Sequence, residues 1–362
     1  MLLRFIRDIN APLNSIGDTA LLISVRRGFY KITKKILAMN ADVNKGCFFT
    51  DNPLHCAAFF QRKEYISYPV EVGGSVEKRN GLGETPLHVA CYNSPEKEIM
   101  EKCLENNPYS YIMDHNGNIP FYTVVAEYNQ KIVMTTELVE LFLDRGLNVD
   151  AKDFRGRSPL HYCFRRSNSQ IASIFLRNNA YLDLTTKHSV CLLKYIPTSL
   201  KTNEIGKIIL KFIAMEICKG TPVNETLKER LSKREEADDY LEQCYQEINR
   251  LKSHRIEDTC VTYWKLLTKS IKQLARYTTN YLILEEIEAF DVDLYPIYSA
   301  DILYKFEKGR KRMELMTECS VILNRFSEWK LPGHFINMVI DRLSIAEMEN
   351  LIVAGVTDQH IL

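Results

Sequence analysis

Three of the eight histidines in this chain, His55, His88 and His161, each end a near copy of one tetrapeptide. Histidine is a common metal ligand and general acid or base, so three in equivalent slots could suggest such a site. Cys163, two residues after His161, also suggests a thiol–imidazole pair. Geometry argues against both ideas, because the histidines lie 33 and 73 residues apart and helical side chains two positions apart diverge. We therefore predict no catalytic residue, no metal ligand and no cofactor.

The tetrapeptides recur with a nearly constant spacing. They occupy 52–55, 85–88 and 158–161, with weaker forms at 19–22 and 119–122, and successive second residues are 33, 33, 34 and 39 apart. Threonine, serine or asparagine can cap the following helix, proline suits its first turn, and histidine can connect one unit to the next. A 33-residue period carrying Thr-Pro-Leu-His is the signature of ankyrin repeats, each a β-turn finger followed by two helices. The chain thus resembles an ankyrin-repeat solenoid over residues 1–220, with about six units of which the first and last are degenerate.

Each unit is expected to end at a residue in the left-handed backbone conformation. Glycine and asparagine adopt it most readily, and they recur where the second helices should stop. The positions are Asn40, Gly73, Gly146 and Asn179.

Composition predicts an intracellular protein of the cytoplasm or the nucleus. With 47 Lys and Arg against 46 Asp and Glu, the formal charge of +1 offers no global field for nucleic acid or membranes. No segment has the length and apolarity of a membrane span or a secretory signal. The ten cysteines contain no Cys-x-x-Cys pair, so we expect reduced and mostly buried thiols.

The repeat period stops near residue 220. The charged stretch 221–254 predicts one long connecting helix, and 255–362 predicts a helical domain with a break at 295–298. The basic run 308–312 is interpreted as either a nuclear signal or, more in keeping with its length, a solvated helix end. Proline 332 should start a helix, and 344–347 reads as a capping box that opens another helix ending at Gly355.

The C-terminal part resembles the PRANC domain (pox proteins repeats of ankyrin, C-terminal), an F-box-like domain that follows ankyrin repeats. The resemblance rests on 295–298, on 306–315 and on the helix pair that begins at Leu331 and Pro332. It implies an all-α fold and docking to the Skp adaptor of cullin-RING ubiquitin ligases. The adaptor contacts that we predict are Leu331, Pro332, Ile336, Val339 and Ile340, while Leu343, Met348 and Leu351 should hold the two helices together.

The ankyrin repeats should bind a target protein through finger tips and first-helix ends, which line the concave face of such stacks. The residues predicted for this face are Phe48, Phe49, Asp51, Leu82, Glu84, Tyr92, His115, Asn116, Phe154, Arg155, Arg157 and Arg165, with Phe59 and Phe60 either on it or packed between repeats. Two functions follow. The chain recruits a target to a ubiquitin ligase, or it is a stoichiometric inhibitor or scaffold, for example one that masks a transcription factor.

Overall fold

The structure is a computed structural model that describes residues 8–49, 51–66, 73–93, 97–105, 112–121, 136–153, 156–182, 194–196, 200, 203–326 and 333–357. In these ranges the chain forms helices and turns, and the one strand-like pairing among them is a bridge between Arg255 and Thr262. The chain divides into two compact units, 1–162 and 163–362. The division falls within α9 (Pro159–Arg165).

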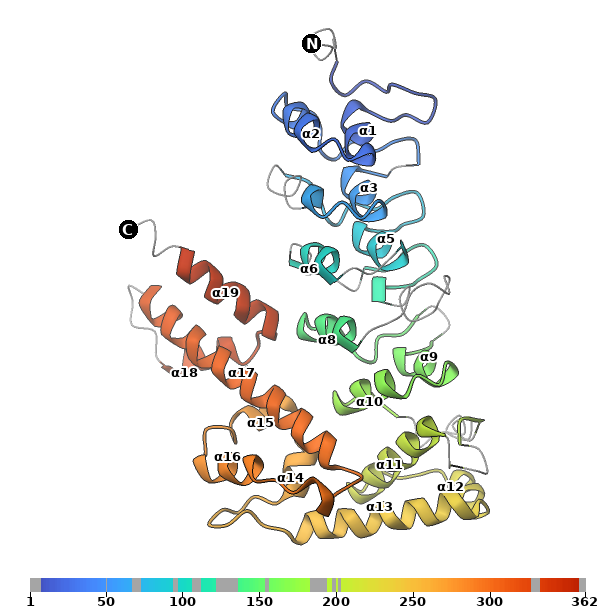
Figure 1. Cartoon of the computed structure of the whole chain (residues 1–362), viewed down its shortest axis with the longest axis vertical. Helices are drawn as coiled ribbons and strands as arrows, with labels where there is room; N and C mark the ends of the chain where they lie inside the picture. Colours follow the sequence, from blue (N-terminus) through green and yellow to red (C-terminus); the bar gives the residue numbers. More distant parts are fainter. Residues whose placement is uncertain are drawn as a thin grey trace. The chain divides into compact units, whose positions relative to one another are not determined.

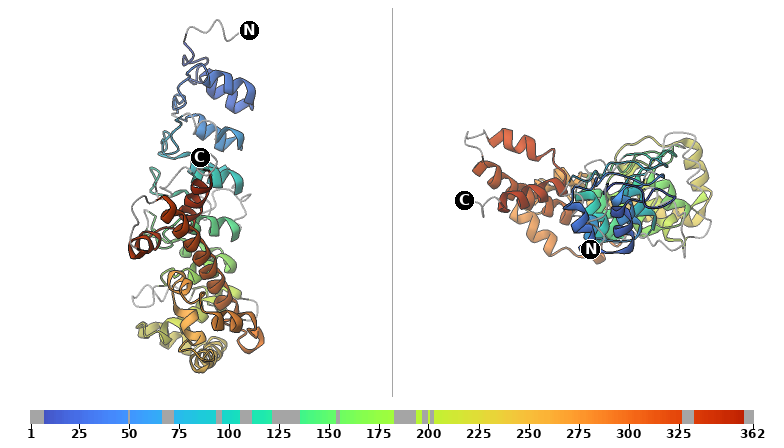
Figure 2. Two further views of the ribbon diagram at one scale, coloured as in Figure 1. Left: turned by 90° about the vertical axis from the view of Figure 1, so that its left-hand side faces the viewer. Right: turned by 90° about the horizontal axis from the view of Figure 1, so that it is seen from above.

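The first unit is built from pairs of short helices. They are α1 (Ala20–Arg27), α2 (Tyr30–Leu37), α3 (Pro53–Phe59), α5 (Pro86–Asn93), α6 (Lys97–Glu105) and α8 (Thr136–Asp144). Figure 1 shows α1, α3 and α5 following one another in one row, with α2 and α6 in a second row, and the side view in Figure 2 shows the helices of this unit stacked in chain order. The apolar residues between the rows are buried; Leu22, Ala57 and Cys91, for example, are 0% exposed.

Neighbouring finger loops of this unit are joined by backbone hydrogen bonds. Phe48 N donates to Ile16 O at 3.0 Å, Gly81 N to Phe49 O at 3.1 Å, and His115 N to Leu82 O at 3.0 Å. Four fingers also share an internal turn, in which the side chain of Asn14, Asn80, Asp114 or Asp153 accepts the backbone N–H four residues later. The backbone bonds between fingers hold the second, third and fourth fingers on the preceding ones.

The histidines of the tetrapeptides connect consecutive units. His55 Nε2 lies 2.9 Å from Glu84 O, and His88 Nε2 lies 2.9 Å from Asn118 O. In both rings Nδ1 accepts a backbone N–H, from Asn52 at 3.2 Å and from Thr85 at 3.0 Å. Because a carbonyl oxygen only accepts hydrogen bonds, Nε2 is the donor to Glu84 O and to Asn118 O, which assigns to both rings the neutral tautomer with its proton on Nε2. The predicted structural role of this slot is confirmed for these two histidines.

Acidification should destabilise the first unit through His88. Burial lowers the pKa of this fully buried imidazole to about 4, because a charged ring would lose hydration and face the Thr85 N–H. A depressed folded-state pKa means that the stabilisation is complete above the unfolded value near 6.5 and is lost as pH falls toward 4. We expect hydrogen exchange of the α5 amides to show a loss of about 3 kcal/mol over this window.

The control uses the same slot in another unit. His161 is exposed, although its Nδ1 also accepts a backbone N–H, from Ser158 at 3.1 Å. His88→Asn should reduce the pH dependence, leaving the part that comes from His55, whose pKa burial also lowers, whereas His161→Asn should leave it unchanged. Equal pH profiles for wild type and His88→Asn would contradict this account.

The predicted left-handed positions are confirmed. The φ angles are 58° at Asn40, 91° at Gly73, 81° at Gly146 and 63° at Asn179. Among these, Gly146 N donates to Leu143 O at 3.0 Å, one of the bonds that close the end of α8.

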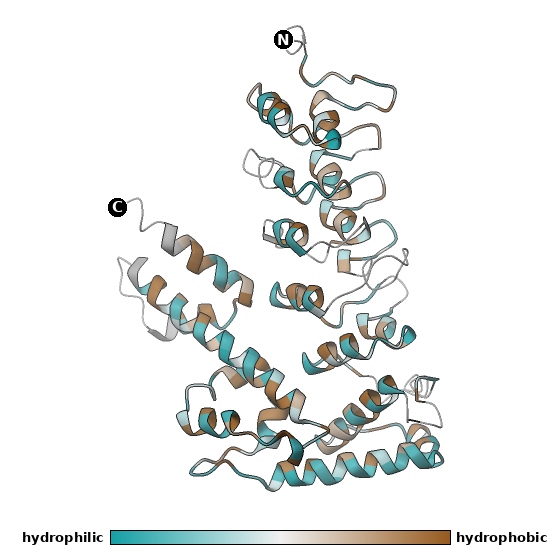
Figure 3. Ribbon diagram, viewed as in Figure 1, coloured by the Kyte–Doolittle hydropathy of each residue, from teal (hydrophilic) through white to brown (hydrophobic). Residues whose placement is uncertain are grey.

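The second unit contains the remaining helices. They are α10 (Ser169–Arg177), α11 (Glu204–Cys218), α12 (Glu225–Ser232), α13 (Glu235–Ser253), α14 (Tyr263–Thr268), α15 (Ile271–Ala275), α16 (Tyr281–Glu288), the 3-10 turn η3 (Val292–Leu294), α17 (Ser299–Phe326), α18 (Gly333–Ile340) and α19 (Ile345–Thr357). Figure 3 shows that α13 is largely hydrophilic along its length, as its many charged residues require.

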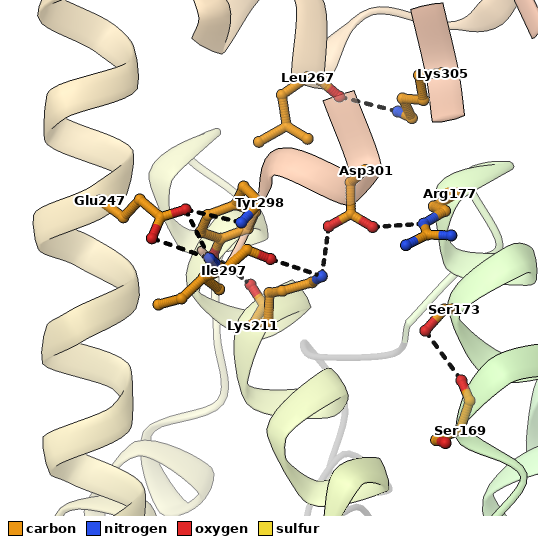
Figure 4. A network of polar contacts seen from close by, with 10 residues as sticks. All are labelled: Ser169, Ser173, Arg177, Lys211, Glu247, Leu267, Ile297, Tyr298, Asp301 and Lys305. Carbon is orange, nitrogen blue, oxygen red and sulfur yellow. Dashed lines mark hydrogen bonds and ion pairs between the residues drawn. The ribbon is translucent and has the colours of Figure 1, made fainter. Parts of the chain in front are cut away.

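A buried polar network joins α10 and α11 to α13 and α17 (Figure 4). The Asp301 carboxylate, 1% exposed, lies 2.5 Å from Arg177 Nε and 2.5 Å from Lys211 Nζ. Lys211 Nζ also donates to Ile297 O at 3.1 Å. These contacts explain why α10 and α11 belong to the same compact unit as the C-terminal helices. The predicted boundaries at 220 and 254 stay predictions.

The helix break predicted at 295–298 is present, and its backbone is held by the same network. Glu247 accepts hydrogen bonds from Ile297 N and Tyr298 N at 2.8–3.1 Å, and burial raises the pKa of this carboxyl. The Tyr298 hydroxyl, with its side chain fully buried, donates to Lys211 O at 2.9 Å. Residues 295–298, one of the segments on which the resemblance rests, are therefore held in place by hydrogen bonds within the fold.

The single connecting helix predicted over 221–254 is wrong. The structure has two helices there, α12 and α13, separated at Lys233 and Arg234. The break fits the pattern of buried residues, because Ala237 in a continuous helix would lie about 120° around the axis from Leu231. Two helices allow both apolar faces to be buried.

The interpretation of 308–312 is also corrected. This run lies in the middle of α17, and Arg312 is 4% exposed. Its Nη2 donates to Asp341 O at 3.2 Å and to Leu343 O at 2.9 Å, the carbonyls just after α18. The run is therefore not a helix end, and one of its cations is buried within the fold.

The last two helices pack on α17. Ile336, Ile340, Ile345 and Met348 form a buried cluster with Cys319, and Leu343 and Leu351 pack against it. The predicted capping box is confirmed, since Ser344 N donates to Glu347 Oε2 at 2.7 Å and Glu347 N to Ser344 Oγ at 3.2 Å. The predicted stop at Gly355 is wrong, because α19 continues to Thr357.

Candidate functional site

The first unit contains a groove of about 610 Å³ along the ends of its first helices and the bases of its fingers. Three successive repeats contribute to it, with a fourth adding its finger. Its lining residues are Arg26, Asp51, His55, Cys56, Phe59, Phe60, Asn80, Leu82, Glu84, Val89, Tyr92, Asp114, Asn116 and Asn118.

The structure brings together five of the predicted target-binding residues in this groove. They are Asp51, Leu82, Glu84, Tyr92 and Asn116. Leu82 and Tyr92 are 63% and 42% exposed, so both side chains are accessible to a partner. Phe59 and Phe60 join them, with exposed fractions of 52% and 37%, so neither is fully packed between repeats.

The second finger presents two further aromatic rings. Phe48 and Phe49 are 70% and 67% exposed. The Phe48 ring lies so close to Gly17 that a Cβ there would be 2.8 Å from a ring carbon, and Gly17 has a φ of 82°. A side chain at position 17 would displace the ring, so the first finger supports the position of Phe48.

His115 and Asn116 line a second, open hollow with Arg79, Met113 and Asp114. Met113 is 46% exposed there. The Asp114 carboxylate has a structural role in the turn, because it accepts the backbone N–H groups of Asn116 and Asn118 at 2.8 Å.

The remaining predicted residues of the target surface lie elsewhere. Phe154 and Arg155 are outside the described residues, and Arg165 belongs to the second unit. Arg157 is engaged within its own finger: its Nε donates to Asp153 Oδ2 at 2.9 Å, and its guanidinium lies 4.7 Å from the Tyr162 ring centroid. Its side chain therefore holds the finger turn.

Arg26 is a groove residue that sequence reasoning missed. It lies in the last turn of α1, its guanidinium is paired with Asp18 at 2.7 Å, and its Cζ is 6.0 Å from the Phe60 ring centroid. A signal was present, since position 26 precedes position 59 by 33 residues and so is its repeat equivalent.

The predicted adaptor contacts are only partly at the surface. Ile336 and Ile340 are each 1% exposed because they pack on α17, so they are not surface contacts in this structure. Val339 is half-buried. Leu331 and Pro332 lie outside the described residues. An exposed residue that was not predicted, Met338, is 47% exposed on α18.

The buried cysteines are poor nucleophiles. Burial raises the pKa of Cys56, Cys103 and Cys163 to about 12, so these thiols stay protonated near neutral pH. In the described part of the chain no group of three or more His, Cys, Asp or Glu side chains is arranged to hold a metal ion. The groove can bind a surface of matching shape and charge.

Comparison with known proteins agrees with the repeat architecture. The family model for ankyrin repeats (3 copies) matches residues 21–112 and 87–188. The ankyrin repeat protein FPV223 of fowlpox virus is 27% identical over 123 residues, which cover 34% of this chain and 81% of that protein. Fowlpox virus FPV244 is 27% identical over 144 residues, 40% of this chain and 20% of that protein. Variola virus OPG189 is 25% identical over 189 residues, 49% of this chain and 30% of that protein.

The chain therefore contains ankyrin repeats followed by further C-terminal helices, and it is similar to ankyrin-repeat proteins of poxviruses. Repeats of this family typically have no catalytic activity and bind other proteins. No helix in the described residues has both the length and the apolar character needed to cross a membrane.

Proposed function

We propose that this chain is a non-catalytic adaptor that holds a target protein in the groove of its first unit. The observation that carries the proposal is the exposure of Leu82, Tyr92, Phe59 and Phe60 in one concave surface. Aromatic side chains of this kind anchor protein interfaces, and their burial by a partner would contribute about 25 cal/mol per Å².

The groove should lose its target when its exposed side chains are changed. Leu82→Arg with Tyr92→Ala should reduce target capture from a cell extract by at least about 10-fold, since each removes an anchor of more than about 1 kcal/mol. The measurement is quantitative affinity capture with the full chain.

The matched control is Tyr281→Ala. Tyr281 is 68% exposed on α16, in the second unit, so its loss should leave capture unchanged. Retention of the same captured proteins by the groove variant would contradict the proposed site. Circular dichroism melting verifies that both variants are folded.

The finer form of the proposal is recruitment of the target to a ubiquitin ligase. The resemblance to F-box-like domains implies that α18 and α19 dock onto the Skp adaptor, which would raise the effective concentration of target near the ligase. Because Ile336 and Ile340 are covered by α17, docking would use Leu331 and Pro332 together with the exposed side of α18, which includes Met338.

Burial of Ile336 and Ile340 favours the second candidate, a stoichiometric inhibitor or scaffold whose C-terminal helices complete the fold. A binding measurement with purified Skp adaptor distinguishes the ligase proposal from the inhibitor or scaffold function. Under the ligase proposal it binds the full chain, and Leu331→Ala with Pro332→Ala abolishes that binding while target capture continues. If wild type does not bind the adaptor, the inhibitor or scaffold function replaces the ligase proposal.

A further inference from the structure

Two carboxylates in the groove are held side by side by a single amide. Asn80 Nδ2 donates to Asp51 Oδ1 and to Glu84 Oε2, both at 3.0 Å. The orientation of Asn80 is fixed from the other side, because its Oδ1 accepts Leu82 N and Glu84 N at 3.0 Å. The finger therefore presents an acidic pair to the groove.

The negative charge of this pair is not neutralised within the described part of the chain. Neither Asp51 nor Glu84 forms an ion pair there, and the hydrogen bonds of Asn80 occupy one oxygen of each. Among the described residues, the one cation that lines the groove is Arg26, which is already paired with Asp18. Both carboxylates are half-buried, so water screens them less than a fully exposed pair.

Aromatic rings border the same groove. Phe59, Phe60 and Tyr92 are 52%, 37% and 42% exposed, and the faces of such rings attract cations. The Arg26 guanidinium, 6.0 Å from the Phe60 ring centroid, is a cation already in that environment. Acidic charge with aromatic walls matches a flat, cationic side chain.

We propose that the occupant of the groove is a basic segment of the target protein, with an arginine directed at Asp51 and Glu84. The guanidinium presents several N–H donors in one plane, so it can bond both carboxylates while its face lies against an aromatic ring. Apolar neighbours of that arginine would pack on Leu82 and Tyr92. This inference rests on the proposed function and specifies the chemistry of the partner.

The test is selection of a random displayed peptide library on the full-length chain. We expect groove-binding peptides to be enriched in arginine beside apolar residues. Asp51→Asn with Glu84→Gln should weaken the selected peptides by at least about 10-fold, because two charge-assisted hydrogen bonds are lost. Their affinity should also fall with added salt for wild type and much less for this variant.

The control has the same change of charge outside the groove. Glu64→Gln with Glu77→Gln removes two exposed carboxylates of the first unit and should leave peptide affinity unchanged. Peptides that depend on Leu82 and Tyr92 but show no arginine preference, or that bind the Asp51/Glu84 variant equally, would overturn the basic-segment proposal alone. If every selected peptide binds the Leu82→Arg and Tyr92→Ala variant as tightly as wild type, the groove itself is not a binding site and both proposals fail.

Discussion

Asp301→Ala should lower the free energy of unfolding of the second unit by about 3–5 kcal/mol. The carboxylate is 1% exposed and pairs with Arg177 and Lys211, whose side chains are 19% and 11% exposed. Removing the acid leaves two largely buried cations without their counter-charge. Both tryptophans, Trp264 and Trp329, belong to residues 163–362, so urea unfolding followed by tryptophan fluorescence reports this unit.

Two controls separate loss of the pair from loss of a carboxylate. Asp239→Ala removes an exposed carboxylate from α13 and should change stability by no more than about 0.5 kcal/mol. Asp301→Leu combined with Arg177→Met and Lys211→Met replaces all three charges by apolar groups and should recover much of the lost stability. A wild-type urea midpoint for Asp301→Ala would contradict the role given to the network.

Ile340→Ala should release the C-terminal helices from α17. Ile340 is 1% exposed in the cluster formed with Cys319 and Met348, and large-to-small changes at such sites cost about 2–5 kcal/mol. We expect faster hydrogen exchange in α18 and α19, with little change in the first unit. Because this exchange is measured on the isolated chain, it tests whether Ile340 packs against α17 and does not depend on docking to a partner.

Met338→Ala is the matched control on the same helix. Met338 is 47% exposed, so its truncation should leave exchange in α19 unchanged. If the chain binds the Skp adaptor, Met338→Ala should weaken that binding directly. Ile340→Ala would affect the binding only through the loss of helix packing. Equal exchange in Ile340→Ala and wild type would show that the cluster does not hold these helices.

The repeat units could be predicted because their signals are local. Asn40 and Gly146 end helices through their own backbone preference, and His55 and His88 reach the next unit from a fixed slot. Once the period is known, part of the groove lining follows from it. Asp51, Leu82, Glu84, Tyr92 and Asn116 were all found from their places in the repeat.

The features that were missed depend on contacts between distant parts of the sequence. Asp301 and Arg177 are 124 residues apart, and nothing in either local sequence indicates the pair. The break at Lys233 has neither glycine nor proline, and Arg312 looks like a surface residue until α18 supplies the carbonyls it binds. Burial of Ile340 likewise requires α17, so the short amphipathic helix alone suggested an exposed face.

The central claim, that the groove of the first unit holds the target, is most directly tested by photocrosslinking. A photoreactive amino acid is placed at position 82, which is 63% exposed in the groove, or at position 281, which is 68% exposed in the second unit. On irradiation of cells that express the chain, we predict one discrete crosslinked protein from position 82, lost in the Asp51→Asn and Glu84→Gln background, and none from position 281. No crosslink from position 82, or the same product from both positions, would contradict the claim.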